Sequence, residues 1–406
     1  MKAYRWIFLI LVTGFFAGCN KDSEPELVGD WQRRAVFPRS ERSHAAYFVI
    51  GNKGYVIGGY NGTTTLRREV FEFDHTGGSG QGIWTQKRNF PQEAIARQQA
   101  VGFAFRHMNG KDYGYVGTGY GYVGKDWITL KDFWRYDKDN DSWEQVAPLP
   151  DEYEGVEGLP RQGAIAFSLQ DKSNNKWYGY IGCGYKDDPE REDLTDFWRF
   201  DPEGETPKTE EEKLETNDDK PWIGKWTPVF GYGGSKRTGA SVFVIDNKAY
   251  ICNGKRFVSN VYTNDFWRFD PNETDPDRVW IGSPKALRTM ANVNRDEDYD
   301  DDYGTLGRAF GVAYVVPVHG RNDFRGHIVG GNNSNWEYDH FEDLWVQRTY
   351  FFNNQTKFAR EGMISFSFPE TGRAFVGLGK TSSAYYDEIW EFIPLIDDET
   401  YSDLIQ

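Results

Sequence analysis

The sequence predicts an all-β fold, namely a six-bladed β-propeller with four-stranded blades. Four strand signals recur in the same order through six repeats between residues 30 and 393, three of them in all six repeats and the fourth in five. A strand signal around Trp31 precedes the first repeat, and the last repeat lacks its fourth strand. A single four-stranded sheet cannot bury both faces, whereas sheets packed around an axis can. We therefore expect the segment around Trp31 to complete the last blade and close the ring.

The composition agrees with a β fold and limits the possible partners. The 406 residues include 44 glycines, and 17% of them are aromatic, which favours strands and turns over disorder. The formal net charge of −15 repels phosphate backbones and anionic lipid surfaces. Nucleic acid is therefore not expected as a partner.

The N-terminal segment is predicted to be a lipoprotein signal peptide covering residues 1–18. A basic start at Lys2 and Arg5 precedes an apolar run over residues 6–16, which is too short to span a bilayer. Ala-Gly-Cys follows the run at residues 17–19 and resembles a bacterial lipobox, which implies acylation of Cys19. The alternative is an ordinary secretory signal that ends near a cysteine.

A tether is expected over residues 19–29, and a C-terminal tail over residues 394–406. The polar and acidic residues after Cys19 resemble the surface-export signals of Bacteroidota lipoproteins. The predicted location is therefore the bacterial outer membrane, with a lipid anchor and possible display at the cell surface. Cys183 and Cys252 are expected to be small buried residues rather than a disulfide pair.

The first two signals of each repeat define the inner strands. One is an arginine that opens an apolar or small-residue strand, and the next is an aromatic or apolar strand that ends in glycine. Glycine permits the close backbone approach needed near an axis. The six strand-opening arginines are Arg42, Arg97, Arg161, Arg237, Arg308 and Arg360.

The last two signals define the outer strands, where large aromatic side chains fill the wider space between sheets. The third strand begins with an acid followed by an apolar and aromatic pair. The six acids are Glu69, Asp132, Asp196, Asp265, Asp343 and Glu388. The fourth strand carries a tryptophan at Trp84, Trp143, Trp226 or Trp280, with a weaker version at residues 350–352.

The arginine, the glycine doublet, the acid-aromatic strand and the spaced tryptophan together resemble Kelch repeats of the galactose oxidase/Kelch-type superfamily. The resemblance covers about residues 30–393. It implies a propeller, but propellers host many functions, so function must be argued from the site.

The six arginines are expected to gather on one face of the propeller, because strands alternate in direction from the axis outward. A ring of arginines at the mouth of the central channel would suit an anionic group on a glycan or protein ligand. The alternative is that each arginine pairs with the acid of its own repeat, which would make the ring structural.

The loops between second and third strands share this face and supply further candidate ligand contacts. Aromatic faces stack on sugar rings and amides bond to hydroxyls, while Tyr, Trp and Arg are also enriched in protein interfaces. The alternative is ordinary turn chemistry and loop packing. The candidates are Tyr122, Trp127, Arg256, Asn333 and Trp336.

Two insertions interrupt the repeats. Residues 202–221 are expected to form a solvated loop on the opposite face. The acidic segment 294–304 is expected on the face of the arginines, either as a flap over them or, less consistently with its spacing, as a calcium site.

The favoured function is a cell-surface propeller that binds a glycan or protein ligand without catalysis. One alternative is a sugar-modifying enzyme. A Kelch mutarotase acting on sialic acid would suit an arginine-lined mouth, whereas the ligand set of copper sugar oxidases has no matching motif. No phosphate loop or nucleophile elbow is present, so no catalytic residue, metal or cofactor is assigned. Another alternative is an assembly scaffold.

Overall fold

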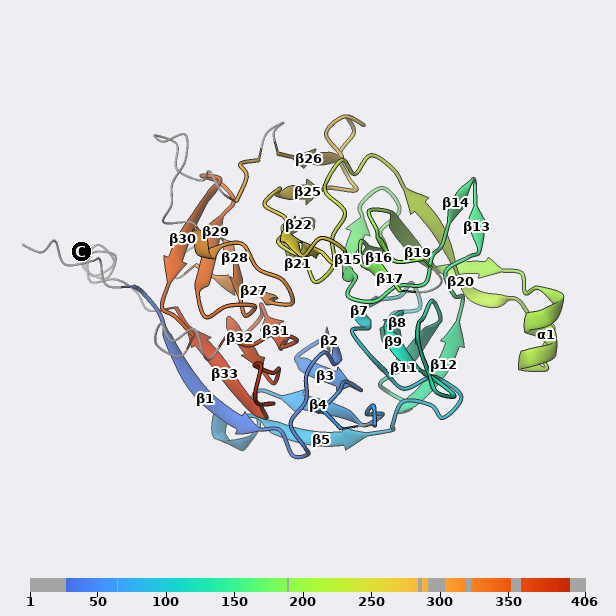
Figure 1. Ribbon diagram of the computed structural model, residues 1–406, viewed down its shortest axis with the longest axis horizontal. Coiled ribbons are helices and arrows are strands. Elements are labelled where there is room, and N and C mark those ends of the chain that lie inside the picture. The colour runs from blue at the N-terminus through green and yellow to red at the C-terminus, as the bar shows by residue number, and fades with distance from the viewer. Residues whose placement is uncertain are drawn as a thin grey trace, which may run out of the picture.

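The computed structural model describes residues 27–394, except 64, 188–189, 284–286, 291–303, 319–322 and 352–358. Within this part of the chain, six sheets have four antiparallel strands each, and we number them 1 to 6 by the position of their innermost strand in the chain. Figure 1 shows the six sheets around a common centre, as expected for a β-propeller. The innermost strands are β2, β7, β15, β21, β27 and β31.

Sheets 1 to 3 each run outward from the centre in chain order. Sheet 1 contains β2 (Ala46–Ile50), β3 (Lys53–Ile57), β4 (Val70–Asp74) and β5 (Ile83–Lys87). Sheet 2 contains β7 (Val101–Arg106), β8 (Asp112–Gly117), β11 (Phe133–Asp137) and β12 (Ser142–Val146). Sheet 3 contains β15 (Ile165–Asp171), β16 (Lys176–Gly182), β19 (Phe197–Thr206) and β20 (Trp222–Val229).

Sheets 4 and 5 follow the same order, and sheet 6 takes its outermost strand from the N-terminal segment. Sheet 4 contains β21 (Ser241–Ile245), β22 (Lys248–Cys252), β25 (Trp267–Phe269) and β26 (Trp280–Gly282). Sheet 5 contains β27 (Val312–Pro317), β28 (Phe324–Val329), β29 (Asn335–Asp339) and β30 (Leu344–Arg348). Sheet 6 contains β31 (Ile364–Phe368), β32 (Arg373–Gly377), β33 (Glu388–Ile393) and β1 (Asp30–Val36).

Shorter elements decorate the loops of these sheets. They are β6 (Arg97–Gln98), β9 (Tyr120–Val123), β10 (Asp126–Thr129), β13 (Glu152–Tyr153), β14 (Val156–Glu157), β17 (Tyr185–Lys186), β18 (Glu192–Asp193), β23 (Lys255–Arg256), β24 (Val261–Tyr262), the 3-10 turn Gly78–Gly80 and α1 (Glu210–Thr216). The insertion 202–221 is thus an extension of β19 followed by α1, whose N-terminus is capped by Thr209. Figure 1 shows α1 projecting from the edge of the molecule.

The core lies between the sheets. The first strands alternate between more and less buried side chains, as β2 shows, and their buried residues contribute to six hydrophobic clusters. Each cluster joins two neighbouring sheets, and one of them joins sheet 6 to sheet 1 through Phe366 and Phe73, whose rings lie 5.9 Å apart. Burial of apolar area between sheets is the main force that holds such a ring together.

A glycine in the second strand allows adjacent sheets to approach closely. A Cβ atom at Gly179 would lie 2.3 Å from the Phe103 ring of sheet 2, and one at Gly114 would lie 2.2 Å from the Phe48 ring of sheet 1. Sheets 4 and 6 have the small residues Ala249 and Ala374 in the corresponding strands. The small residue therefore makes room for an aromatic ring of the preceding sheet.

The glycine doublets predicted from the sequence connect each repeat to the next. The second glycine has a positive φ, such as +103° at Gly119, and its N–H donates to the carbonyl of the next repeat's strand-opening arginine, as from Gly119 to Arg161 (2.7 Å). The same bond occurs at all six junctions, including Gly379 to Arg42 (2.8 Å) between the last and first repeats. Glycine is favoured there because other residues rarely adopt this backbone conformation.

Strand β1 pairs with β33 at the outer edge of sheet 6. The buried carboxylate of Glu391 on β33 accepts hydrogen bonds from Arg34 Nε on β1 (2.6 Å) and from Arg373 Nε and Nη2 on β32 (2.6 and 2.8 Å). Trp31 packs against Phe392 and Phe351, with ring centroids 5.0 and 4.9 Å away. The N-terminal strand is thus attached by backbone pairing, charge and aromatic packing.

Candidate functional face

The six strand-opening arginines mark the side of the sheets that we call the arginine face, where the innermost strands begin. All six side chains are buried. In repeat 2, Arg97 Nη1 and Nη2 donate to the two oxygens of Asp132, each at 2.7 Å, and Arg97 Nη1 also donates to the carbonyl of Thr118 (3.1 Å). Trp134 Nε1 donates to the same carboxylate (2.8 Å). Repeat 3 has the equivalent contacts among Arg161, Asp196 and Trp198.

These contacts favour the structural alternative for the arginines. Burial alone would raise the pKa of Asp132, but the charge and hydrogen bonds of Arg97 hold that pKa below its usual value. The remaining arginine–acid pairs are Arg42–Glu69 (3.7 Å), Arg237–Asp265 and Arg360–Glu388 (3.0 Å).

The predicted ring of guanidinium groups at the channel mouth therefore needs correction. Each side chain extends from the start of the first strand, across the end of the second, toward the start of the third. Buried backbone carbonyls accept its hydrogen bonds along this path, and a carboxylate or serine near the start of the third strand is its last partner. Contact of Arg42, Arg97, Arg161, Arg237, Arg308 or Arg360 with a ligand stays a prediction, and their burial directs attention to other residues of this face.

Arg308 differs from the others because a serine replaces the acid. Its Nη2 donates to Ser334 Oγ (2.6 Å) and its Nη1 to the Ser334 carbonyl (2.8 Å). Trp336 Nε1 also donates to Ser334 Oγ (3.1 Å), as the tryptophans of repeats 2 and 3 do to their acids. Among the described residues no carboxylate forms an ion pair with Arg308, and burial lowers its pKa to about 9.

The prediction that Asp343 opens a third strand in repeat 5 is wrong. The third strand is β29, which contains Trp336, and the segment after Asp343 is the fourth strand β30. Asp343 instead accepts a hydrogen bond from the Tyr338 hydroxyl (2.9 Å). Trp336 and Asn333 are consequently buried, with 2% and 6% of their surface exposed, and do not present a loop surface to a ligand.

Six residues, each two positions after a strand-opening arginine, form a closed ring of backbone hydrogen bonds around the axis. Each N–H donates to the carbonyl of the equivalent residue in the preceding repeat, at 2.8 to 3.0 Å. All six have φ between +52° and +63°. They are His44, Gln99, Gly163, Gly239, Phe310 and Gly362.

Charged and polar side chains gather beside this axial ring. The half-buried His44 imidazole lies against Gly362 and packs edge-on to Phe310, with centroids 5.5 Å apart. Glu361 Oε1 is 2.9 Å from Lys380 Nζ. Lys255 Nζ lies 6.0 Å from the centre of the Phe310 ring. The centre of the arginine face thus holds an imidazole, a carboxylate and two ammonium groups. We call these four residues, His44, Glu361, Lys380 and Lys255, the axial cluster.

The protonation states of this axial cluster follow from burial and charge. Burial lowers the pKa of His44 to about 4, so its imidazole is neutral at pH 7. Burial alone would raise the pKa of Glu361, but the hydrogen bond from Lys380 and nearby positive charge lower it. Glu361 is therefore a carboxylate beside a neutral imidazole, a combination that can accept and relay protons.

Two hairpins on the arginine face expose apolar side chains. The β9–β10 hairpin exposes Tyr122, whose ring centroid lies 3.7 Å from that of the partly exposed Trp127. In the β23–β24 hairpin, Arg256 is exposed and so are Phe257 (44%), Val258 (66%), Val261 (57%) and Tyr262 (56%). The sequence predicted Tyr122, Trp127 and Arg256 as surface residues but did not single out the four apolar neighbours.

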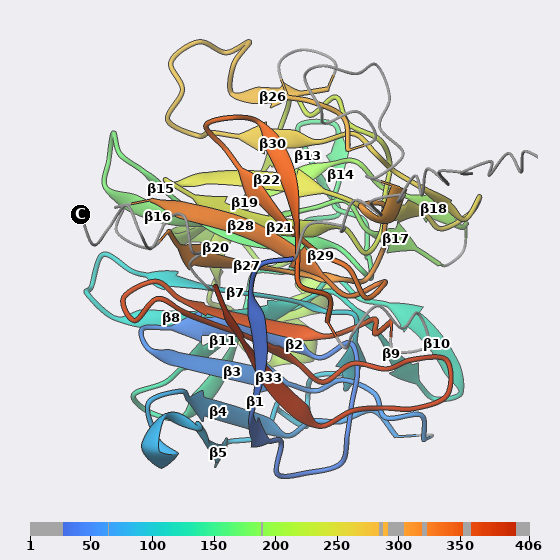
Figure 2. The same ribbon diagram turned by 90° about the vertical axis from the view of Figure 1, so that its left-hand side faces the viewer.

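The loop of sheet 3 connects these hairpins. Tyr120 of β9 donates its hydroxyl hydrogen to Asp187 Oδ2 (2.7 Å). On the other side, the backbone N–H of Phe257 donates to Asp193 Oδ1 (2.7 Å). Figure 2 shows β9, β10, β17 and β18 on the same side of the molecule. Loops of three successive repeats therefore build one surface.

Comparisons with known proteins bear on the fold. No protein-family model matches the chain, and no curated protein sequence matches it. The solved structure of YjhT is similar to it over 90% of this chain and 98% of that chain, with a TM-score of 0.59 and 14% sequence identity. The chain has the β-propeller fold.

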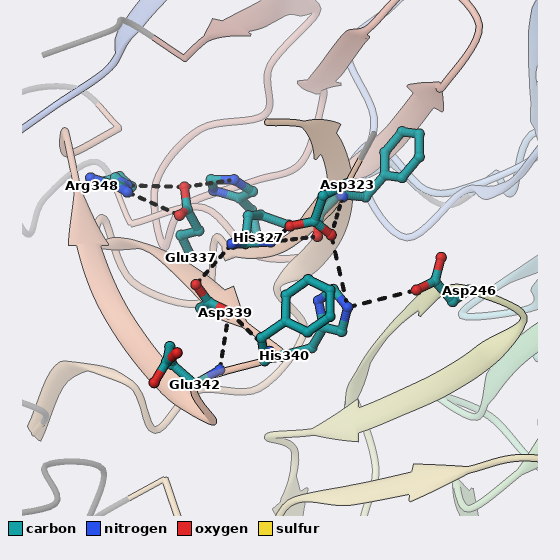
Figure 3. A network of polar contacts seen from close by, with 11 residues as sticks. Asp246, Asp323, His327, Glu337, Asp339, His340, Glu342 and Arg348 are labelled. Atoms are coloured by element: carbon teal, nitrogen blue, oxygen red, sulfur yellow. Dashed lines mark hydrogen bonds and ion pairs between the residues drawn. The ribbon is translucent and has the colours of Figure 1, made fainter. Parts of the chain in front are cut away.

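A second polar network of the propeller lies away from the arginine face, at the turns of sheets 4 and 5 (Figure 3). His340 Nε2 is 3.7 Å from Asp246 Oδ2 and 3.8 Å from Asp323 Oδ1. The buried His327 is 3.3 Å from Glu337, and burial lowers its pKa to about 4. This network links neighbouring sheets and is more consistent with packing than with chemistry.

Other sequence predictions fall on different parts of the propeller. Cys183 and Cys252 are buried free thiols, and burial raises the pKa of each to about 12. No described group of three or more His, Cys, Asp or Glu side chains could hold a metal ion. Cys19, residues 1–18, most of the tether, most of the C-terminal tail and most of segment 294–304 lie outside the described residues. No described helix has the length and apolarity needed to cross a membrane.

Proposed function

We propose that the chain is a closed six-bladed Kelch-type propeller that binds another protein through its arginine face. Pairing of β1 with β33 and the hydrogen bonds at all six junctions support six blades and closure. Lipid attachment at Cys19 and display on the outer membrane belong to the same proposal, and they are supported by the sequence of the N-terminal segment.

The distribution of exposed apolar side chains carries the proposal of a protein partner. Of the 13 large hydrophobic side chains exposed among the described residues, six lie on the two hairpins of the arginine face. Clustered apolar and aromatic side chains on a surface mark protein interfaces. We define this apolar patch as Tyr122, Val123, Phe257, Val258, Val261 and Tyr262.

Photo-crosslinking from the apolar patch tests this function. We expect p-benzoylphenylalanine in place of Tyr262 to give a discrete covalent product with a partner in cells that produce the full chain. The matched control places the same group at Phe341, which is 66% exposed on a turn of sheet 5. Adding Phe257→Ser and Val258→Ser is expected to reduce the product about tenfold, which corresponds to about 1.4 kcal/mol. Equal products from positions 262 and 341, or none from 262, would contradict a partner site here.

A second candidate function is modification of a sugar, and the axial cluster favours it. Opening and closing a sugar ring requires removal of a proton from one oxygen and delivery of a proton to another. The Glu361 carboxylate could accept a proton, and the Lys380 ammonium could donate one. Lys255 and Lys380 would also attract a carboxylated sugar.

The Glu361→Gln variant tests this second function. If the axial cluster is catalytic, the wild-type chain accelerates exchange between the anomers of free sialic acid, and the variant loses roughly 100-fold of that acceleration. Exchange spectroscopy by NMR measures the rate directly. An unchanged rate with wild-type protein would remove this candidate and leave the binding function standing.

A further inference from the structure

A groove that we call the outer groove lies between sheets 1 and 2, and none of its lining residues belongs to the apolar patch or the axial cluster. It has a volume of about 580 Å³ and is lined by residues 86–93 together with Ser142 and Trp143. This volume falls within the usual range of about 300–1,000 Å³ for small-ligand sites. The sequence did not indicate it, because its residues come from a linker and two outer strands.

The walls of this outer groove are held in place by the protein itself. The Asp141 carboxylate accepts two hydrogen bonds from the Arg88 backbone N–H (2.9 and 3.1 Å), and Trp143 Nε1 donates to the Arg88 carbonyl (3.2 Å). The Phe90 backbone N–H donates to the Arg68 carbonyl (2.8 Å). A groove fixed in this way needs little reorganisation to bind a ligand.

Trp143 offers an aromatic face rather than a polar edge to the groove. Its indole N–H is already bonded to the Arg88 carbonyl, and its ring packs against Phe90 and Tyr136, with centroids 5.1 and 4.9 Å away. The side chain remains partly exposed where it lines the groove. A fixed aromatic ring of this kind suits the C–H face of a sugar.

The polar groups that line the groove are mostly uncharged. Gln86, Asn89, Gln92 and Ser142 supply amides and a hydroxyl. The Gln86 amide bonds to Asn89 Oδ1 (3.3 Å), whereas within the described part of the chain neither the Asn89 amide nitrogen nor the Gln92 amide has a protein partner. Amides without partners can donate to and accept from sugar hydroxyls.

The charged groups of the groove nearly cancel. Lys87 Nζ lies 3.9 Å from Glu72, and the remaining lining charges are those of Arg88 and Glu93. The groove is thus nearly neutral in a protein whose formal net charge is −15, and it carries no net charge that would select an ionic ligand. We propose that this outer groove binds a neutral oligosaccharide, with a sugar ring on Trp143 and hydroxyls bonded to Asn89 and Gln92.

Calorimetric titration of the purified full chain tests the proposal. The probes are neutral hexasaccharides of β-1,4-glucose, α-1,4-glucose, β-1,4-xylose and β-1,4-mannose, with hexagalacturonate as an acidic comparison. We expect at least one neutral probe to bind with a Kd of roughly 1 mM or below. Trp143→Ala should abolish that binding, and the Asn89→Ala, Gln92→Ala double variant should weaken it about tenfold or more.

The double variant keeps the test valid if loss of Trp143 disturbs the fold, because Asn89 and Gln92 are exposed. Gln32→Ala, an exposed glutamine on β1, is the matched control and should bind as the wild type does. Absence of binding by every neutral probe at about 10 mM, binding of hexagalacturonate alone, or wild-type affinity in the double variant would overturn the proposal. Crosslinking from Tyr262 should be unaffected by these variants, which separates this site from the proposed protein interface.

Discussion

The Asp132→Ala variant is expected to lose about 3–5 kcal/mol of its free energy of unfolding. Arg97 is 3% exposed, and the substitution leaves its guanidinium group without the two 2.7 Å hydrogen bonds to the Asp132 carboxylate. It also removes the acceptor of Trp134 Nε1. Chemical denaturation at pH 7 measures the change.

Two further variants control this result. Asp219→Ala removes an exposed aspartate and is expected to change the free energy of unfolding by less than about 0.5 kcal/mol. Ser334→Asp gives Arg308 the carboxylate that the other repeats have, and is expected to raise stability. If Asp132→Ala lost less than about 1 kcal/mol of its free energy of unfolding, the arginine–acid pairs would contribute little to stability. Arg97 could then bind a ligand without loss of the fold.

The Glu391→Ala variant is expected to loosen the attachment of β1, with a loss of about 3–5 kcal/mol. The buried carboxylate accepts hydrogen bonds from Arg34 on β1 and from Arg373 on β32, and the substitution removes this shared acceptor. Arg373 keeps its hydrogen bonds to the carbonyls of His75 and Gly80, whereas the charged link between β1 and β32 is lost. Hydrogen exchange of residues 30–36 should increase more than exchange elsewhere in sheet 6. Glu152→Ala, which removes an exposed glutamate, serves as the control.

The same carboxylate predicts a dependence of stability on pH. Burial alone would raise the pKa of Glu391, but the hydrogen bonds and charges of Arg373 and Arg34 hold it below the usual value of 4.5. A lowered pKa contributes stability in full above about pH 4.5, and this stability is lost as the pH falls toward the folded-state pKa. The wild-type curve should therefore fall more steeply below pH 4.5 than that of Glu391→Ala. If the free energies of unfolding of wild type and variant changed in parallel with pH, protonation of Glu391 would not be the cause of the loss of stability in acid.

The repeats made most strand positions predictable, and the exception has a physical cause. Wherever an acid precedes the aromatic third strand, as at Asp132, the pattern located that strand correctly. In repeat 5 the same role is taken by Ser334, because a hydroxyl can also accept bonds from an arginine and a tryptophan. Because the pattern required an acid, it assigned Asp343 to the start of the third strand, whereas the strand after Asp343 is the fourth.

The site was harder to predict because sequence order does not give side-chain direction. The alternative that the arginines pair with the acids of their own repeats holds in five repeats, but the pattern could not show that Arg97 extends outward instead of lining the channel. Glycines at 163, 239 and 362 were a signal of positive φ near the axis, yet His44 and Phe310 adopt the same conformation without being glycine. The exposed run at Phe257 and Val258 was visible in the sequence as apolar residues within a loop.

Pairing of β1 with β33 has a consequence for how the molecule is made. The strand that is synthesised first among those described must wait for a partner that is synthesised last. Until then sheet 6 exposes an unpaired edge, the kind of surface that recruits other chains. We therefore expect nascent or truncated chains that lack β33 to aggregate, whereas the complete chain satisfies that edge internally.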